Sequence, residues 1–431
     1  MLIASIITTY YTLFLTDELK IPTMTCSLIM LIATIWDAIN DPIMGVIADR
    51  TNTRWGRYRP YFLVAPILLT IFTTLMWVKP NFSPTGLIIW VLITYIGYGM
   101  TVTLYTMPRM AILPAHINST QERNKVIIFS TAVTAIAYSI GSTFKTQMVD
   151  FFSVTLKFEN GYIPLMLTCG VIATICFWGL FATSKETYVV QSKKKPALRE
   201  IGDVLKHFEL YPLIMIWILA SISYGMMFST SVYYVIYFLA RPDLVTLYMG
   251  IVSAGSLISM VFVMPIALKI LKTGQRALVV TQIGSIVLYG ILFIFGKDNL
   301  MLLYILTFLA TSISAMQNGL VDVLVNDAID YIQLKDGSSS NGVIASIKGF
   351  SQKCGVTVVK SGILAALGVS GYIANAVGSQ PDSVMFTINF LRFGIPVIAS
   401  IAMLAFLKFN PVEKYADEIE EMKQRQLDDM K

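Results

Sequence analysis

Two aspartates one helical turn apart, Asp37 and Asp41, are the residues of this sequence that most clearly indicate chemistry. Both lie inside the apolar run 24–48, which is long enough for a helix that crosses a bilayer. A carboxylate at mid-membrane depth costs at least ~2.5–3.5 kcal/mol, and two carboxylates on one helix face also repel each other. Such a cost is normally tolerated only where a positive guest is bound, so we predict a monovalent metal ion or a shared proton at this pair.

Neutral oxygen atoms accompany the two carboxylates. Asn40 lies three residues after Asp37, so its amide oxygen is available on the same side of the helix. Pro42 has no N–H group and leaves the carbonyl oxygen of Ala38 free. Two carboxylates with neutral oxygens suit a hard monovalent cation, whereas one proton shared by the carboxylates is the alternative. A third interpretation pairs both aspartates with lysines of another helix.

The composition predicts the element that must position these side chains. Of the 431 residues, 55% are hydrophobic and 13% are charged, with a mean hydropathy of +0.68. Soluble domains carry ~25% charged residues. We therefore predict an all-α, multi-pass membrane protein with the lipid bilayer as a partner. The net charge of +6 indicates no nucleic acid, because the basic residues lie mostly between the apolar runs. The sequence has no nucleophile–base pair, so it predicts no catalytic residues, no enzyme and no cofactor.

Twelve membrane spans are predicted from the apolar runs. They cover residues 1–16, 24–48, 59–79, 86–108, 125–148, 161–183, 211–239, 244–269, 276–296, 300–325, 341–368 and 382–408. The predicted organisation is an N-terminal six-helix bundle (1–183), a cytoplasmic linker (184–210), a C-terminal six-helix bundle (211–408) and a cytoplasmic tail (409–431). The first span is short, so we expect either a stubby helix one or a truncated one whose first residues precede Met1.

The distribution of Lys and Arg predicts the orientation. If alternate connections and the tail face one side, that side carries 21 Lys and Arg, and the opposite connections carry six, with Lys145 among them. Basic residues gather on the cytoplasmic side of membrane proteins. We therefore predict a location in the cell membrane with the N- and C-termini in the cytoplasm.

A cluster of charges follows the second predicted span. Gly45 allows a close approach of helices, Asp49 can pair with a basic residue, and Arg54 and Arg57 follow in the loop. We predict that this cluster latches neighbouring helices in one conformational state. Simple anchoring of the topology by the arginines is the alternative. The same gating role is predicted for Arg123, Asp327 and Asp330.

Several motifs resemble one family of carriers. The segments WDAINDPIMG (36–45) and RWGRYRP (54–60) closely resemble the glycoside–pentoside–hexuronide:cation symporters. The run YIGYGMTVT (95–103) resembles the fourth helix of that family, and Lys353 with Gly355 resembles its eleventh. The resemblance covers nearly the whole chain. It implies a major facilitator fold, with twelve transmembrane helices in two six-helix bundles.

The resemblance also implies a function and a set of residues. The family carries a sugar or glycoside together with Na⁺, Li⁺ or H⁺ by alternating access, which implies a secondary active symporter; we expect a monomer. Lys353 matches the lysine that approaches both the cation and the sugar. The residues that match the family's cation site are Asp37, Asp41, Asn40 and Thr103.

The predicted substrate site departs from the melibiose-type pattern. Thr106 stands where that pattern has an aspartate, Met110 where it has a tryptophan, and Thr131 where it has an arginine. A galactoside is therefore disfavoured as the substrate. Tyrosine rings can stack on sugars and donate hydrogen bonds, although a packing role is favoured for any single one. The candidate substrate-binding residues are Lys353, Tyr98, Thr106, Met110, Thr131 and Tyr11.

Because positive side chains lie within the spans, the sequence leaves open whether the substrate is a neutral or an acidic sugar. Arg109, Lys348, Lys353 and Lys360 would recognise a uronide. Pairing with acidic residues such as Asp322 is the interpretation that we favour. The alternative functions are an exporter or a lipid or drug carrier on the same fold, and a sugar sensor that does not transport.

Overall fold

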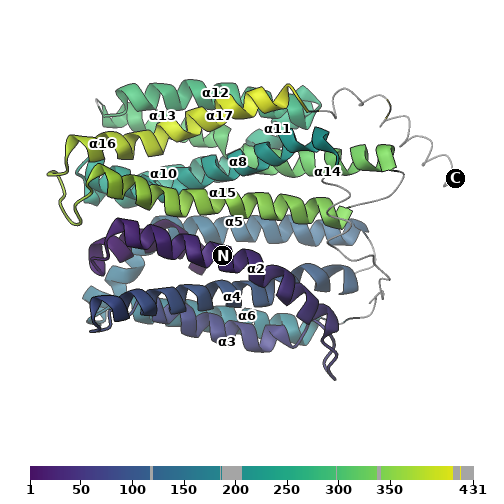
Figure 1. The fold of residues 1–431 in the computed structure, drawn as a ribbon, viewed down its shortest axis with the longest axis horizontal. Helices are drawn as coiled ribbons and strands as arrows, with labels where there is room; N and C mark the ends of the chain where they lie inside the picture. The colour runs from purple at the N-terminus through teal and green to yellow at the C-terminus, as the bar shows by residue number, and fades with distance from the viewer. Residues whose placement is uncertain are drawn as a thin grey trace. The chain divides into compact units, whose positions relative to one another are not determined.

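The computed structural model describes residues 1–116, 120–184, 186, 206–297, 299–336, 341–410 and 418. It divides into two compact units (Figure 1). The N-terminal unit comprises Met1–Ser192 with the short segment Tyr372–Asn375, and the C-terminal unit comprises Lys193–Gly371 with Ala376–Lys431. Helices dominate both units, as expected where backbone polar groups must find their partners within one segment.

Six helical rods form the N-terminal unit. Their bounds are α1 (Leu2–Leu13) with the π-helical turn η1 (Phe14–Glu18), α2 (Thr23–Arg50), α3 (Tyr61–Leu75), α4 (Pro84–His116), α5 (Thr120–Asp150) with the π-helical turn η2 (Phe151–Thr155), and α6 (Tyr162–Thr183).

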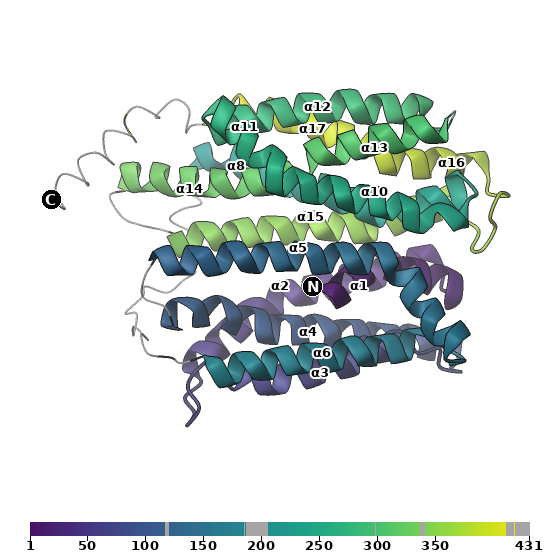
Figure 2. The same cartoon turned by 180° about the vertical axis from the view of Figure 1, so that it is seen from behind.

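Within this unit, α4 packs against both α2 and α3, α3 packs against α6, and α1 packs against α5 (Figure 1 and Figure 2). Gly97 lets α3 and α4 approach closely, because a Cβ atom at this position would lie 2.2 Å from the Phe72 ring. The contact between α2 and α4 positions both aspartates of the predicted cation site, since α2 carries them.

The C-terminal unit is built from six further rods. Their bounds are η3 (Phe208–Leu210) with α8 (Tyr211–Ser229), α9 (Ser231–Tyr233) and η4 (Tyr234–Phe238); η5 (Pro242–Leu244) with α10 (Val245–Ile258), η6 (Ser259–Val263) and α11 (Met264–Leu271); α12 (Gly274–Phe295); α13 (Leu300–Ser314) with α14 (Met316–Asp336); α15 (Asn341–Ser370); and α16 (Asp382–Asn389) with η7 (Phe390–Gly394) and α17 (Ile395–Leu407).

Helix α8 packs against α14, α15 and α17 in the C-terminal unit, and α12 packs against α13 and α17. A cluster of apolar side chains that includes Trp217, Leu278, Leu324 and Met403 fills the space between them. Gly355 lets α15 approach α8, since an added Cβ atom would lie 2.7 Å from the carbonyl oxygen of Ile218. Close packing through small residues is the usual way in which membrane helices associate.

The rods confirm the twelve predicted spans. Nine segments of the described residues are apolar and long enough to cross a membrane. Rods α1 with η1, α3 and α5 with η2 complete the twelve. Helices α4 and α14 run beyond the predicted spans 86–108 and 300–325, to His116 and Asp336, because they continue as helices beyond their apolar parts. Hydropathy identifies the part of a helix that lipid covers. It does not show where the helical hydrogen bonds of the backbone end.

Lys145 was wrongly counted among the connections, since it lies inside α5 with 9% of its surface exposed. Its amine donates a 2.6 Å hydrogen bond to the Tyr162 hydroxyl. It also stands 4.6 Å from the ring centroids of Tyr10 and Tyr162. Aromatic faces and a hydroxyl acceptor together hold the ammonium group within the helical unit.

Candidate functional site

The predicted cation residues come together where α2 packs against α4 in the N-terminal unit. The Thr103 hydroxyl of α4 donates a 2.7 Å hydrogen bond to Oδ1 of Asp41 on α2. It also lies 3.2 Å from the carbonyl oxygen of Gly99, one turn earlier on its own helix. Two residues 62 positions apart in the sequence, Asp41 and Thr103, thus share one site.

Gly99 makes room for the other carboxylate. A Cβ atom added to Gly99 would lie 2.3 Å from Oδ1 and 3.1 Å from Cγ of Asp37. The half-buried Asp37 side chain therefore rests against the backbone of α4, where any other residue would push it away. Because Gly99 and Thr103 are four residues apart on α4, the two contacts lie on the same helix face.

Asn40 supplies a further polar group on the same face of α2. Its side chain is 5% exposed, and its Nδ2 atom has no hydrogen-bond partner among the described residues. A half-turn of the amide exchanges nitrogen and oxygen, which would turn this donor into an oxygen ligand. The site then offers carboxylate, hydroxyl and amide oxygens, the ligand types that hard cations prefer.

Gly99 is the one residue of this site without a role in the sequence-based prediction. The run YIGYGMTVT (95–103) resembles a family helix, but the resemblance assigns no role to its glycines. A glycine four residues before Thr103 was the available signal, because a glycine inside a helix often marks a close approach.

Two of the candidate substrate residues belong to a chain of aromatic rings. Tyr11 stacks on Tyr95 with centroids 5.6 Å apart, and Tyr95 lies 6.3 Å from Tyr98. Tyr11 is only 1% exposed and also meets the edge of Trp77, so it packs in the core of the N-terminal unit. Tyr98 is half-buried and close enough to Asp37 to interact with it electrostatically.

The remaining substrate candidates are dispersed. Thr106 is half-buried on α4, three residues beyond Thr103. Lys353 is half-buried on α15 of the C-terminal unit. The side chains of Met110 and Thr131 lie outside the part of the chain that the structure describes.

The loop between α2 and α3 is fastened by Glu186, which follows α6. Its carboxylate accepts hydrogen bonds from the backbone N–H groups of Arg57, Tyr58 and Arg59, at 2.7, 2.8 and 3.0 Å. The Arg59 guanidinium donates to the carbonyl oxygen of Phe181 at 2.7 Å. Three backbone donors converging on one carboxylate form a charge-assisted anchor, so this loop is tied to the end of α6.

Gly56 is required by this anchor. Its φ of +108° is a left-handed conformation, and an added Cβ atom would lie 2.6 Å from Oε1 of Glu186. We expect Gly56→Ala to destabilise the loop by ~1–3 kcal/mol, because the strain and the lost hydrogen bonds act together. Thermal unfolding and trypsin cleavage after Arg54 and Arg57 measure the effect.

The matched control is Gly179→Ala on α6, where an added Cβ atom meets nothing within 4 Å. This variant should unfold at the wild-type temperature or slightly above it, since alanine is the better helix former. Equal unfolding temperatures and cleavage rates for Gly56→Ala and wild type would show that the anchor contributes no stability.

The other predicted gating residues are only partly described. The Arg54 guanidinium is exposed and stacks 4.4 Å from the ring centroid of Trp55. On α15, Lys348 pairs with Asp322 of α14 at 2.6 Å, which confirms the pairing favoured for this lysine. Gly45, Asp49, Arg123, Asp327 and Asp330 lie outside the residues whose surroundings the structure describes.

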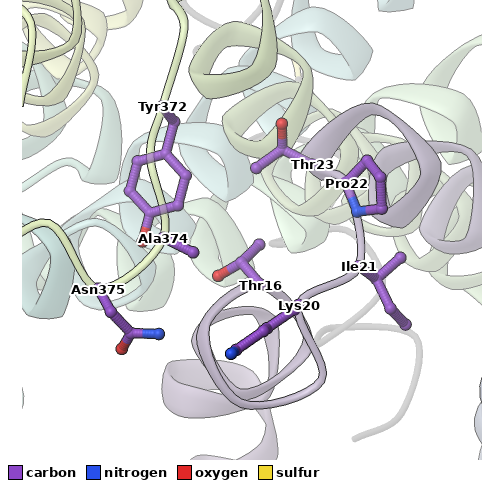
Figure 3. Close-up of a pocket in the computed structure, with 8 residues that line it drawn as sticks. All are labelled: Thr16, Lys20, Ile21, Pro22, Thr23, Tyr372, Ala374 and Asn375. Carbon is purple, nitrogen blue, oxygen red and sulfur yellow. The ribbon is translucent and has the colours of Figure 1, made fainter.

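A pocket of about 480 Å³ lies at the end of η1 in the N-terminal unit. Its lining includes Thr16 and Lys20 on one side and Tyr372 and Asn375 on the other (Figure 3). Asp17 holds the two sides together, because its carboxylate accepts a 2.6 Å hydrogen bond from the Tyr372 hydroxyl and its carbonyl accepts one from Asn375 at 2.8 Å. None of the residues that line the pocket belongs to the predicted cation or substrate sets.

Comparisons with known proteins identify the family of this chain. A family model described as MFS/sugar transport protein matches residues 1–414. The isoprimeverose transporter of Lactiplantibacillus pentosus is 27% identical and aligns with 95% of this chain and 86% of its own length. A putative glycoside/cation symporter of Escherichia coli (strain K12) is 24% identical over 91% of this chain and 85% of its own length.

The fold is also that of solved transporters. A bacterial homologue of the human lysosomal transporter Spinster, in an inward-facing and unoccupied conformation, has a TM-score of 0.66 at 11% identity. The match covers 95% of this chain and 93% of that chain. This likeness confirms the predicted major facilitator fold. The family model and the relatives show that the chain is a multi-pass membrane transporter rather than an enzyme. The chain belongs to the MFS/sugar transport protein family, within the glycoside–pentoside–hexuronide:cation symporters.

Proposed function

We propose that this transporter carries a sugar or glycoside into the cell together with Na⁺ or Li⁺. The cation is bound by Asp37, Asp41, Asn40 and Thr103. The observation that carries the proposal is the 2.7 Å hydrogen bond between Thr103 and Asp41, because it joins α2 and α4 at a cluster of oxygen ligands. A proton would need only the carboxylates, whereas the hydroxyl and the amide add ligands that an alkali cation uses.

Cation binding supplies the coupling in this proposal. A guest of positive charge removes the repulsion between Asp37 and Asp41, so the occupied and empty sites differ in free energy. If sugar affinity rises when the cation binds, cation affinity must rise by the same factor when the sugar binds. Lys353 is proposed as the positive group that responds to this change of charge.

The substrate is proposed from the relatives and from the residues together. One relative is named for isoprimeverose and another for glycosides. Thr106 and Tyr98 offer hydroxyl groups, which suits the neutral hydroxyls of a pentoside or glycoside. We propose a neutral sugar or glycoside, with Tyr98, Thr106 and Lys353 as contacts.

The proposed setting is the cell membrane, with both termini in the cytoplasm and a monomer as the working unit. Support comes from the excess of Lys and Arg in alternate connections. Lys145 lies inside α5 and so no longer counts among the basic residues of the extracellular connections. The excess of Lys and Arg on the proposed cytoplasmic side is therefore larger.

Uptake by the purified chain in liposomes tests the proposal. Glycosides, pentosides and uronides are offered under inward gradients of Na⁺, Li⁺ or H⁺. A tenfold Na⁺ gradient supplies ~1.4 kcal/mol, so one-to-one coupling should give ~tenfold accumulation of the transported sugar. An ionophore that collapses the Na⁺ gradient should abolish it.

Other outcomes assign different functions. Accumulation driven by a pH gradient alone would replace the alkali cation by a proton. Uptake that is equal under every gradient would remove the proposed coupling. Outward pumping alone would make the chain an exporter, and sugar binding without movement would make it a sensor.

A further inference from the structure

Arg392 is the buried cation of the C-terminal unit that the proposed symport does not use. It lies on the π-helical turn η7 between α16 and α17, and none of its surface is exposed. Its Nε, Nη1 and Nη2 atoms have no hydrogen-bond partner among the described residues. Other cations of the described residues have acidic partners, as Lys79 has Glu18, Arg241 has Asp243 and Lys348 has Asp322.

Aromatic rings surround the guanidinium group. Its Cζ atom lies 4.9 Å from the ring centroid of Phe393, 5.7 Å from that of Tyr248 and 6.0 Å from that of Tyr289. Tyr234 closes the cluster, with its ring 6.0 Å from Tyr248 and 5.0 Å from Phe393. These rings come from η4, α10, α12 and η7, so four separate segments of the unit build the site.

Ring faces do not satisfy this cation. A guanidinium group has five N–H donors in its plane and no acceptor, whereas a ring face interacts with its charge and accepts no strong hydrogen bond. The hydroxyl groups of Tyr234 and Tyr248 are also buried and have no partner among the described residues. Among the described residues Arg392 has no acidic partner, and the neighbouring hydroxyl of Tyr289, which interacts with Arg392, is also hydrogen-bonded to Ser314 at 2.8 Å.

We propose that Arg392, Tyr234 and Tyr248 bind a small monovalent inorganic anion, such as chloride. One negative charge balances the one positive charge of the arginine, which removes the penalty of a buried unpaired ion. N–H and O–H groups both donate to the anion, and charge-assisted hydrogen bonds of this kind are the stronger ones. A water molecule could accept the hydrogen bonds but would leave the charge uncompensated.

The π-helical geometry helps to aim these groups. Both Arg392 and Tyr234 lie on π-helical turns, η7 and η4, which are wider than an α-helical turn and recur at functional sites. Asn389 fixes the start of η7, since its Nδ2 atom donates a 2.9 Å hydrogen bond to the carbonyl oxygen of Phe293 on α12. The site is thus held by interactions within the C-terminal unit and stands apart from Asp37 and Asp41.

Halide titration of the purified full chain tests the site. Thermal unfolding in detergent is followed while sodium gluconate is replaced by sodium chloride or bromide at constant sodium and ionic strength. We expect a saturable rise of about 2–4 °C in Tm with either halide. Crystals grown in bromide should show anomalous scattering beside the Arg392 guanidinium.

Matched variants separate this site from a general salt effect. Arg392→Gln should lose the halide-dependent rise, whereas Arg241→Gln should keep it, because Arg241 is exposed and pairs with Asp243. If Arg392→Gln does not fold, Tyr248→Phe decides the matter: it keeps the ring, removes one donor and should weaken halide affinity ~5-fold.

Three results would overturn the proposal: a wild-type Tm that does not distinguish halide from gluconate, an unchanged halide response in Arg392→Gln or Tyr248→Phe, or bromide bound elsewhere only. The titration measures Tm at a single Na⁺ concentration. A failure of the anion site therefore leaves the proposed Na⁺-coupled sugar uptake unaffected.

Discussion

Asp37→Asn and Asp41→Asn should each abolish cation-driven accumulation of sugar. Asparagine keeps the size of the side chain and removes its charge, so the proposed site loses half of its negative charge without a steric change. Loss of one charged partner at a buried site costs ~2–5 kcal/mol, which corresponds to a fall in cation affinity of at least ~30-fold. Accumulation under a Na⁺ gradient, measured in liposomes, should fall to the level seen without a gradient.

Exchange of sugar across the membrane separates coupling from folding in these variants. Each variant should still exchange external for internal sugar, since exchange needs the substrate site and not the net movement of a cation. Asp243→Asn is the matched control, because Asp243 is exposed and pairs with Arg241 in the C-terminal unit. Wild-type accumulation in both Asp37→Asn and Asp41→Asn would reject the cation site.

Gly99→Ala has the second largest expected effect. Its Cβ atom would lie 2.3 Å from Oδ1 of Asp37, so the carboxylate must leave its place against α4. We expect cation affinity to fall at least tenfold, or by ~1.4 kcal/mol, although no ligand atom has been removed. The Na⁺ concentration that gives half-maximal uptake measures this change.

Gly97→Ala is the control for packing between helices. It introduces the same methyl group on the same helix, but this group meets the Phe72 ring at 2.2 Å. It should therefore lower Tm and leave the Na⁺ dependence of uptake within ~2-fold of wild type. If the two glycine variants change the Na⁺ dependence equally, the effect belongs to helix packing and not to the position of Asp37.

The aspartates of the proposed cation site could be singled out from local sequence, because a charged side chain is rare and costly within a membrane span. Asp37 and Asp41 are conspicuous only because the residues around them are apolar. Their spacing of four residues also places them on one helix face, whatever that helix packs against. Thr103 was reached only through the resemblance, since a threonine in an apolar helix carries no signal of its own.

The contacts of Gly99 and Glu186 could not be predicted in the same way. Gly99 of α4 contacts the Asp37 side chain of α2 because the two helices pack together at this position. That contact depends on the packing and cannot be inferred from either helix alone. Glu186 lies 127–129 residues from the three backbone groups that it anchors. The predicted latch relied on the side chains of the loop arginines, whereas the anchor uses the backbone N–H groups of Arg57 and Arg59.

By itself, the sequence determined the twelve helices, the membrane as their solvent and the two carboxylates for which a positive guest is proposed. These properties follow from composition and from the period of one helix, which are local. Tertiary structure alone decided that Thr103 meets Asp41, that Lys145 is hydrogen-bonded to Tyr162, and that Arg392 stands among aromatic rings from four segments. Each of these contacts requires side chains from different helical segments to pack at the same depth. The period of a single helix carries no information about such packing.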